Sequence, residues 1–113
     1  MIDVCNPLDF SGGAPSLFVA ITDSLGEQLQ HSLPRTSVVK ALNTMNADVM
    51  VNPASIPGDH VAFVCGNDAA AKATTVSLLG ELGWPSERVV DCGDITGACA
   101  TESYLLLWLR IMG

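Results

Sequence analysis

The sequence predicts an α/β domain in which flanking helices cover a mostly parallel sheet. Short apolar or β-branched runs alternate with stretches of helical spacing, an alternation that is typical of parallel sheets. The chain has 113 residues, enough for a single domain with one hydrophobic core. Hydrophobic residues make up 49% of the chain and charged residues 15%, which indicates a well-filled core and some surface that a partner covers.

Four segments have the composition of main strands, and each is bounded by turn residues. The first ends at Asn6-Pro7, because proline lacks the N–H that a sheet ladder needs. The apolar run from Val61 to Cys65 is continuous, as is typical of a strand covered on both faces. The four segments are residues 2–5, 38–43, 61–65 and 89–92, and residues 17–21 are a candidate for a short edge strand.

Three helices are predicted around these strands. Ser24 and Glu27 match a capping box, which begins a helix of about two turns that ends before Pro34. Asp68 can cap the second helix, residues 69–82, and the third helix covers residues 98–112. In the second helix, the side chains expected to face the core are Ala73, Val76, Leu78, Leu79 and Leu82.

Glycine and proline mark the boundaries of two further segments. Gly83 fits the left-handed residue after a helix, Trp84 fits the hydrophobic contact that follows, and Pro85 prevents the helix from continuing. Residues 48–59 are interrupted by prolines and a glycine, and we expect them to form a loop.

The charge balance excludes several classes of partner. The net charge is −7 and the chain has only five Lys and Arg residues, too few for a basic face that binds nucleic acid or a membrane surface. The longest apolar run, residues 104–109, is too short to span a bilayer, and no secretory signal is visible around Asp3. The four cysteines occur singly and are expected to be reduced thiols. Together these features predict a cytoplasmic protein.

Polar residues follow the strand predicted at residues 38–43. This segment starts apolar and ends on Asn43 and Thr44. Because ligands of open α/β sheets bind beyond the carboxyl ends of the strands, we expect any site to include residues 43–47. Asn6-Pro7 follows the first strand in the same way, where it can either line a crevice or only end the strand in a turn.

The cysteines are not predicted to form a metal site. Cys5, Cys65 and Cys92 each end a predicted strand and could gather at one edge of the sheet. However, a free cysteine is typically a small buried hydrophobic residue, and the spacing of metal ligands is absent.

The other titratable groups also have structural explanations. His31 and His60 have no partner histidine at ligand spacing and are expected to be surface residues. Asp91 and Asp94 suit strand-end and capping roles. Because no nucleophile has an adjacent base, no catalytic residue is predicted.

Several ordered segments together resemble one family. They are residues 2–8 (IDVCNPL), 38–44 (VVKALNT) and 61–68 (VAFVCGND), followed by residues 91–95 and 101–109. These segments are similar to NADP-dependent oxidoreductases that resemble coenzyme F-420 (deazaflavin):NADP reductase, and to the cytosolic domain of the six-transmembrane ferric reductases. One departure is Cys5, which stands where the family has Thr or Ser before Asn-Pro.

The resemblance implies that residues 1–113 are the second half of a Rossmann-like domain. The chain would lack the first three strands, the glycine turn and the residues that hold the 2′-phosphate; no G-x-G-x-x-G follows any of its predicted strands. In the family, the nicotinamide meets a flavin or deazaflavin near the end of the strand matched by residues 38–43. The positions carried over as cofactor-binding are Asn6, Pro7, Asn43, Thr44 and Ala47, the last through its backbone N–H.

The activity that the resemblance implies is hydride transfer between NADP and a flavin or deazaflavin. Such an enzyme works by holding two rings face to face, without an essential acid or base. Because the turn that seats the pyrophosphate is absent, we expect the truncated chain to bind no NADP by itself and to be inactive.

Two alternatives remain open at this point. The chain could be a small-ligand module that keeps half of the crevice, or a non-catalytic homodimer. A homodimer would form through the unpaired edge of the strand from Ile2 to Cys5, or through the helix from Tyr104 to Met112, which is apolar on all sides.

Overall fold

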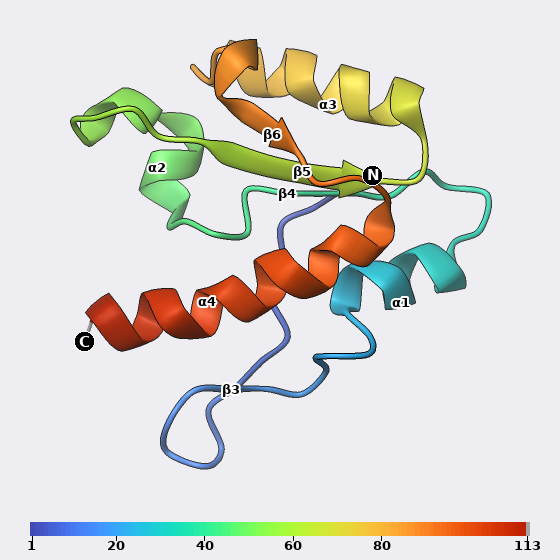
Figure 1. The fold of residues 1–113 in the computed structure, drawn as a ribbon, viewed down its shortest axis with the longest axis vertical. Helices are drawn as coiled ribbons and strands as arrows, with labels where there is room; N and C mark the ends of the chain where they lie inside the picture. The colour runs from blue at the N-terminus through green and yellow to red at the C-terminus, as the bar shows by residue number, and fades with distance from the viewer. Residues whose placement is uncertain (113) are drawn as a thin grey trace.

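A four-stranded mixed sheet lies at the centre of the structure, a computed structural model that describes residues 1–112 (Figure 1). The strand order is β1 (Ile2–Asp3), β4 (Val39–Ala41), β5 (Ala62–Gly66) and β6 (Val89–Asp91). β1 runs parallel to β4 and β5 parallel to β6, whereas β4 and β5 are antiparallel. The prediction of an α/β fold with a mostly parallel sheet is therefore confirmed.

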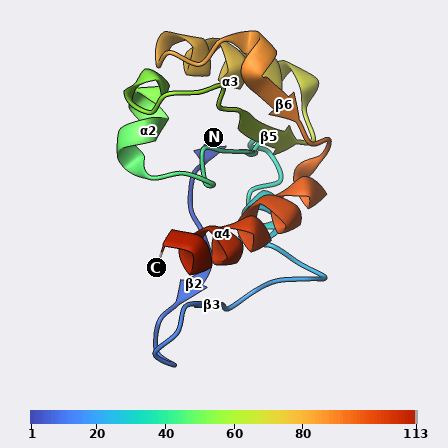
Figure 2. The ribbon, with the colours of Figure 1, turned by 60° about the vertical axis from the view of Figure 1, so that its left-hand side comes forward.

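Helices cover both faces of this sheet (Figures 1 and 2). The helices are α1 (Leu25–Ser32), α2 (Ala47–Val51), α3 (Ala69–Glu81) and α4 (Ala98–Met112), and short 3₁₀ turns lie at Pro53–Ser55, Ser86–Arg88 and Ile95–Gly97. On one face, Leu79 of α3 and Val49 of α2 pack with Val39, Ala41 and Val64. On the other, Ile95 and Ala98 pack with Val38, Cys65 and Leu29 of α1. Because successive side chains of a strand point to opposite faces, β4 and β5 contribute to the packing on both sides of the sheet.

The predicted helix caps are confirmed. Ser24 Oγ accepts the Glu27 N–H at 3.1 Å, and an Asp68 carboxylate oxygen accepts the Ala71 N–H at 3.1 Å. At the end of α3, Gly83 has a φ of +106°, and the Trp84 N–H returns to the Leu79 carbonyl at 2.9 Å. These bonds satisfy backbone groups that a helix end would otherwise leave unpaired.

Two predicted segments differ from the structure. Residues 48–59 are not wholly a loop, because Asn46 accepts the Val49 N–H and caps the five-residue α2. The edge strand expected at residues 17–21 shortens to β3 (Ser16–Leu17), which pairs with β2 (Leu8–Asp9) in a hairpin outside the main sheet. In Figures 1 and 2 this hairpin projects beyond α4. Within residues 1–112 no helix has the length and apolar character needed to cross a membrane.

The core-facing side of α3 is narrower than predicted. Leu79 is buried, but Ala73, Leu78 and Leu82 are exposed. Thr75 is buried instead, because its hydroxyl donates to the Ala71 carbonyl and so needs no solvent.

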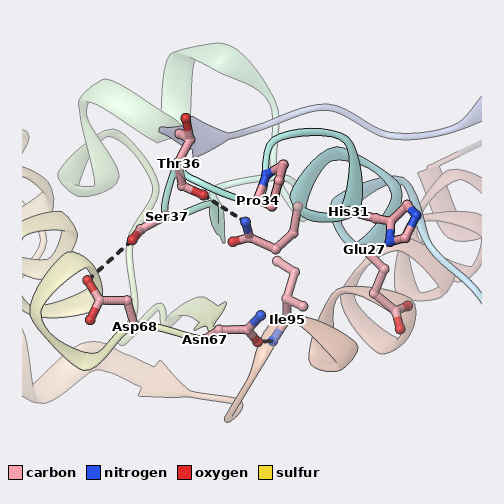
Figure 3. A pocket seen from close by; sticks show the side chains of 9 residues that line it. Glu27, His31, Pro34, Thr36, Ser37, Asn67, Asp68 and Ile95 are labelled. Atoms are coloured by element: carbon pink, nitrogen blue, oxygen red, sulfur yellow. Dashed lines mark hydrogen bonds between the residues drawn. The ribbon is translucent and has the colours of Figure 1, made fainter.

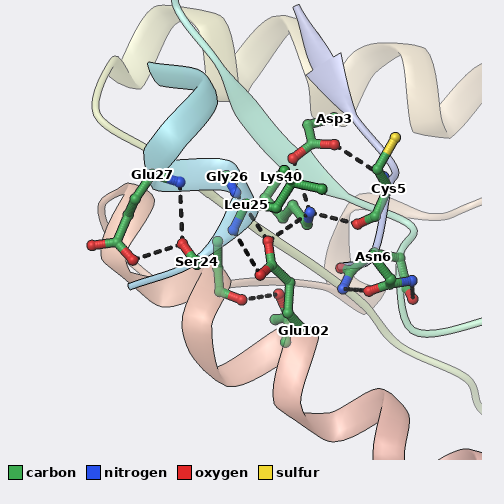
Figure 4. Close-up of polar contacts among 12 residues, drawn as sticks. Asp3, Cys5, Asn6, Ser24, Leu25, Gly26, Glu27, Lys40 and Glu102 are labelled. Atoms are coloured by element: carbon green, nitrogen blue, oxygen red, sulfur yellow. Dashed lines mark hydrogen bonds and ion pairs between the residues drawn. The ribbon is translucent and has the colours of Figure 1, made fainter. Parts of the chain in front are cut away.

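Three charged side chains are buried where β1, β4 and α4 meet (Figure 4). The Lys40 ammonium lies 2.8 Å from Asp3 Oδ2 and 2.8 Å from Glu102 Oε1, and all three side chains are at most 1% exposed. Glu102 also accepts the N–H groups of Leu25 and Gly26, at 2.9 and 3.0 Å, at the start of α1. We call Asp3, Lys40 and Glu102 the buried charge cluster.

Replacing Lys40 with Met should lower the free energy of unfolding by about 3–5 kcal/mol, because two buried carboxylates lose their only shared cation. Lys72→Met is the matched control: in its bridge to Asp91 the two side chains are 16% and 58% exposed, and its loss should cost about 0–1 kcal/mol. Urea unfolding followed by circular dichroism measures both variants. Equal losses would contradict the structural weight given to the cluster.

Candidate functional site

Two depressions lie at opposite ends of β4. The first, of about 680 Å³, lies at the start of β4 (Figure 3). Several of its polar side chains are already engaged within the fold: Gln30 donates to the Thr36 carbonyl and accepts the Val38 N–H, and Asp68 accepts from the Ser37 hydroxyl. This depression therefore offers few free groups to a ligand.

The second depression is an apolar groove of about 370 Å³ beside the end of β4. Thr44, Met45 and Asn46 line one part of it, and aromatic side chains from β5, α4 and the turn after α3 line another: Phe63, Trp84, Tyr104 and Trp108. A groove with many aromatic walls and few polar groups suits a flat ring.

Asn6 and Asn43 meet at the carboxyl ends of β1 and β4. The Asn6 Nδ2 donates to the Asn43 backbone carbonyl at 2.8 Å, and the Asn43 Nδ2 donates to Asn6 Oδ1 at 3.0 Å. Because β1 and β4 are parallel, both residues leave the sheet at the same edge. Asn43 is 2% exposed and Asn6 is half-buried, so the pair is held rigidly at the rim of the sheet.

The backbone before Asn43 adopts a conformation that non-glycine residues rarely take. Leu42 has a φ of +61° although its side chain is buried. A left-handed leucine costs of order 1–2 kcal/mol and is retained only where surrounding contacts hold it. Here the turn at Leu42 is followed directly by the bonds between Asn43 and Asn6.

The other three predicted site residues occupy different positions. Thr44 is half-buried and lines the apolar groove. Ala47 is the exposed first residue of α2, where a helix has no internal acceptor for its N–H. Pro7 is buried, and its carbonyl accepts the Phe18 N–H at 2.9 Å, which anchors the β2–β3 hairpin. The structure thus brings Asn6 and Asn43 into contact, while a cofactor-binding role for the five residues stays a prediction.

Carboxylates accept N–H groups at the start of α1 and α3 and in the turn before α4, whereas the amide side chain of Asn46 caps the five-residue α2. Glu102 accepts two N–H groups at the start of α1, Asp68 caps α3, and Asp94 accepts the Thr96 N–H in the turn that leads into α4. A pyrophosphate binds at a helix N-terminus through these same N–H groups and the positive end of the helix dipole. The N–H groups at the start of α1 and α3 and in the turn before α4 are therefore already bonded to the chain's own carboxylates.

The residues missed by sequence reasoning are Lys40, Glu102 and Leu42. A lysine between Val39 and Ala41 in a buried strand is a signal that it has an anionic partner. Glu102 gave no such signal, because it lies among polar neighbours at the start of α4. The left-handed turn at Leu42 has no mark in the sequence, since leucine normally avoids it.

Comparison with known proteins gives two relevant structures. Protein-family models gave no match, and no curated protein matched. A crystal structure described as a "putative f420 dependent nadp-reductase" from Arthrobacter sp. FB24 has 53% sequence identity and a TM-score of 0.94, covering 99% of this chain and 50% of its own. A hypothetical protein from Sinorhizobium meliloti has 27% identity and a TM-score of 0.63, covering 87% of this chain and 46% of its own.

These similarities confirm the resemblance predicted from the sequence motifs, and they support an oxidoreductase-like family. The chain spans about half the length of each of the two solved structures.

The cysteines are free thiols with different surroundings. Cys65 is buried, and burial raises its pKa to about 12, with a smaller contribution from Cys92, the residue after the neighbouring strand β6. Burial and the charge of Asp91 also raise the pKa of Cys92. Among residues 1–112, no group of three or more His, Cys, Asp or Glu side chains could hold a metal ion. A buried thiol with a raised pKa is a poor nucleophile.

The exposed Cys5 should be alkylated by iodoacetamide at pH 8 in the native protein, whereas Cys65 should not. With a pKa of about 12 rather than 9.0, the thiolate fraction of Cys65 is about a thousandfold lower than that of an ordinary thiol. Peptide mapping by mass spectrometry before and after denaturation measures this. Labelling of native Cys65 as fast as Cys5 would show that β5 is not buried as described.

Proposed function

We propose that this chain is part of an NADP-dependent oxidoreductase that transfers hydride between NADP and a flavin or deazaflavin such as coenzyme F420. The observation that carries the proposal is the 53% identity over 99% of the chain to the Arthrobacter protein described as an F420-dependent NADP reductase. The contact between Asn6 and Asn43, at the sheet edge where ligands of such folds bind, supports it.

The residues at this edge suit the polar rim of a ring better than a phosphate. A carboxamide has two N–H donors and a carbonyl acceptor. In the described part of the chain, Asn6 is half-buried and donates one of its two side-chain N–H groups to Asn43, which leaves its second N–H for a ligand, whereas Asn43 is 2% exposed and holds Asn6 in place. Thr44 adds a hydroxyl at the mouth of the apolar groove. We propose that these groups orient a nicotinamide or deazaflavin ring.

The protein needs no acid or base for this reaction. When bound, the cofactors supply the hydride chemistry, and the protein contributes orientation and exclusion of water. The Asn6–Asn43 pair orients the polar edge of a ring, and the aromatic walls of the groove keep water away from its face. Because hydride transfer depends strongly on ring separation, the rigidity of the pair is its main contribution.

The phosphates of NADP are held, in this proposal, by residues outside these 113. The chain's own carboxylates already accept N–H groups at the start of α1 and α3 and in the turn before α4, and the chain as a whole carries a charge of −7. The isolated chain is therefore inactive. We further propose a cytoplasmic location, where NADP is supplied and single cysteines stay reduced.

Isothermal titration of the isolated 113-residue chain with NADPH should show no tight binding, since carboxylates already accept the N–H groups at the start of α1 and α3 and the net charge of −7 disfavours a diphosphate. Coenzyme F420 fluorescence should respond to the wild-type chain more than to Asn43→Ala. Exposed Asn52→Ala is the control for loss of an asparagine away from the pair. A low-micromolar affinity for NADPH would contradict the proposal that residues outside these 113 hold the phosphates of NADP.

A second candidate is a non-catalytic homodimer. Four apolar side chains of α4, Tyr104, Leu107, Ile111 and Met112, are between 44% and 75% exposed. The segment from Ser103 to Leu109 contains no charged residue, so two copies can meet there without like-charge repulsion despite the net charge. β1 is also an edge strand, and Ile2 and Val4 beside it are 38% and 39% exposed.

Sedimentation equilibrium should then detect a dimer of the wild-type chain. If α4 forms the contact, Ile111→Glu should weaken it by at least roughly tenfold, because the charge is buried against an apolar partner. Leu78→Glu, on the exposed side of α3, should have no effect. A strict monomer at every concentration would end this candidate.

A further inference from the structure

We propose that Lys40 and Glu102 are positioning residues for the Asn6–Asn43 pair, in addition to holding the fold. This inference rests on the proposed function, in which the pair faces the ring of a cofactor. It assigns a task to the buried charge cluster, which that function does not otherwise use.

The buried charge cluster holds both backbone groups of Cys5, the residue before Asn6. The Cys5 N–H donates to Asp3 Oδ1 at 3.0 Å, and its carbonyl accepts from Lys40 Nζ at 2.5 Å. Both backbone groups of the residue before Asn6 are therefore fixed by the buried charge cluster (Figure 4). A shift of the Lys40 ammonium would move the carbonyl of the Cys5–Asn6 peptide, and with it the side chain of Asn6.

Asn43 is connected to Lys40 through the backbone of β4 and the residues that follow it. Lys40 lies in β4, and the strand continues through Ala41 and the left-handed Leu42 to Asn43. The backbone of Lys40 thus leads to one member of the pair while its side chain holds the residue before the other. Through its chain and its side chain, this one lysine connects to both carboxamides.

Three acceptors fix the position of the Lys40 ammonium. The ammonium has three N–H donors, and it contacts three acceptors: Asp3, Glu102 and the Cys5 carbonyl. Glu102 is in turn held by two N–H groups at the start of α1. With no donor left, Lys40 is a positioning residue and has no free hydrogen for a ligand.

The same carboxylate connects the pair to the groove. Glu102 lies in α4, the helix that also carries Tyr104 and Trp108 of the groove wall. Its bond to Lys40 therefore sets the wall of the groove and the Asn6–Asn43 pair relative to each other. A ring bound between them would meet both at a fixed distance.

The test compares Glu102→Gln, Asp3→Asn and Asp91→Asn in the 113-residue chain. In the wild type, the two carboxylate oxygens of Glu102 face three donors: the Lys40 ammonium and the N–H groups of Leu25 and Gly26. Glu102→Gln leaves one acceptor oxygen for these three donors. Asp3→Asn removes the other anion from Lys40 while keeping an oxygen for the Cys5 N–H. Asp91→Asn is the control, because it removes the carboxylate of an exposed lysine bridge at the other edge of the sheet.

The readout is the side-chain carboxamide resonances of Asn6 and Asn43, recorded by ¹H–¹⁵N NMR at a temperature where circular dichroism shows each variant folded. In Glu102→Gln and Asp3→Asn, these resonances should move and hydrogen exchange of the NH₂ groups should rise about tenfold, as for the loss of one charge-assisted hydrogen bond. In Asp91→Asn they should stay as in the wild type. Unchanged resonances in both cluster variants, or an equal change in Asp91→Asn, would overturn the proposal.

Titration with coenzyme F420 separates this inference from the proposed function. If the wild-type chain binds F420, the two cluster variants should bind it about tenfold more weakly, and Asp91→Asn should bind as the wild type does. If neither the wild-type chain alone nor the chain joined to residues that hold the phosphates of NADP responds to F420, the proposed function fails, whereas the NMR comparison still decides whether the buried charge cluster positions the pair.

Discussion

The burial of Lys40 between two carboxylates is the constraint on which the rest of the structure depends. An ammonium out of water must be paired, and Asp3 from β1 and Glu102 from α4 are the partners. Two carboxylates face one cation, and the excess negative charge is met by the N–H groups that begin α1. Those groups reach Glu102 only because α1 approaches α4 closely: a Cβ at Gly26 would lie 2.8 Å from that of Ala98. One cluster thus fixes two strands and two helices relative to each other.

Carboxylates that accept backbone N–H groups also determine which kind of ligand the candidate site suits. Glu102, Asp68 and Asp94 fill helix N-termini with the chain's own negative charge, which leaves uncharged groups at the carboxyl ends of β1 and β4. Asn6 and Asn43 are held by each other, and an aromatic groove lies beside them. This arrangement suits a ring with polar edges, and it agrees with the proposal that other residues hold the diphosphate of NADP.

Local signals predicted the elements that local interactions make. Ser24 with Glu27, Asp68, and Gly83 with Trp84 each form their bonds within a few residues, so the caps and ends of α1 and α3 could be read from the sequence. The meeting of Asn6 and Asn43 followed from the rule for strand ends. The contacts of Glu102 could not be read in this way, because its partners Leu25, Gly26 and Lys40 lie far along the chain. The short α2 and the separate β2–β3 hairpin are local elements that the sequence analysis did not predict. The exposed leucines of α3 were wrongly assigned to the core because helical spacing alone does not reveal how wide a stripe the sheet covers.

Hydrogen exchange at the first residues of α1 measures directly whether Glu102 is held inside the fold. The first N–H groups of a helix normally exchange fast, because they lack acceptors within the helix. If Glu102 accepts from Leu25 and Gly26 inside the fold, these two amides should exchange as slowly as those of β4, while Ala69 and Ala70 at the start of α3 exchange fast. Exchange at Leu25 and Gly26 as fast as at Ala69 would show that Glu102, and with it Lys40, is not held as described.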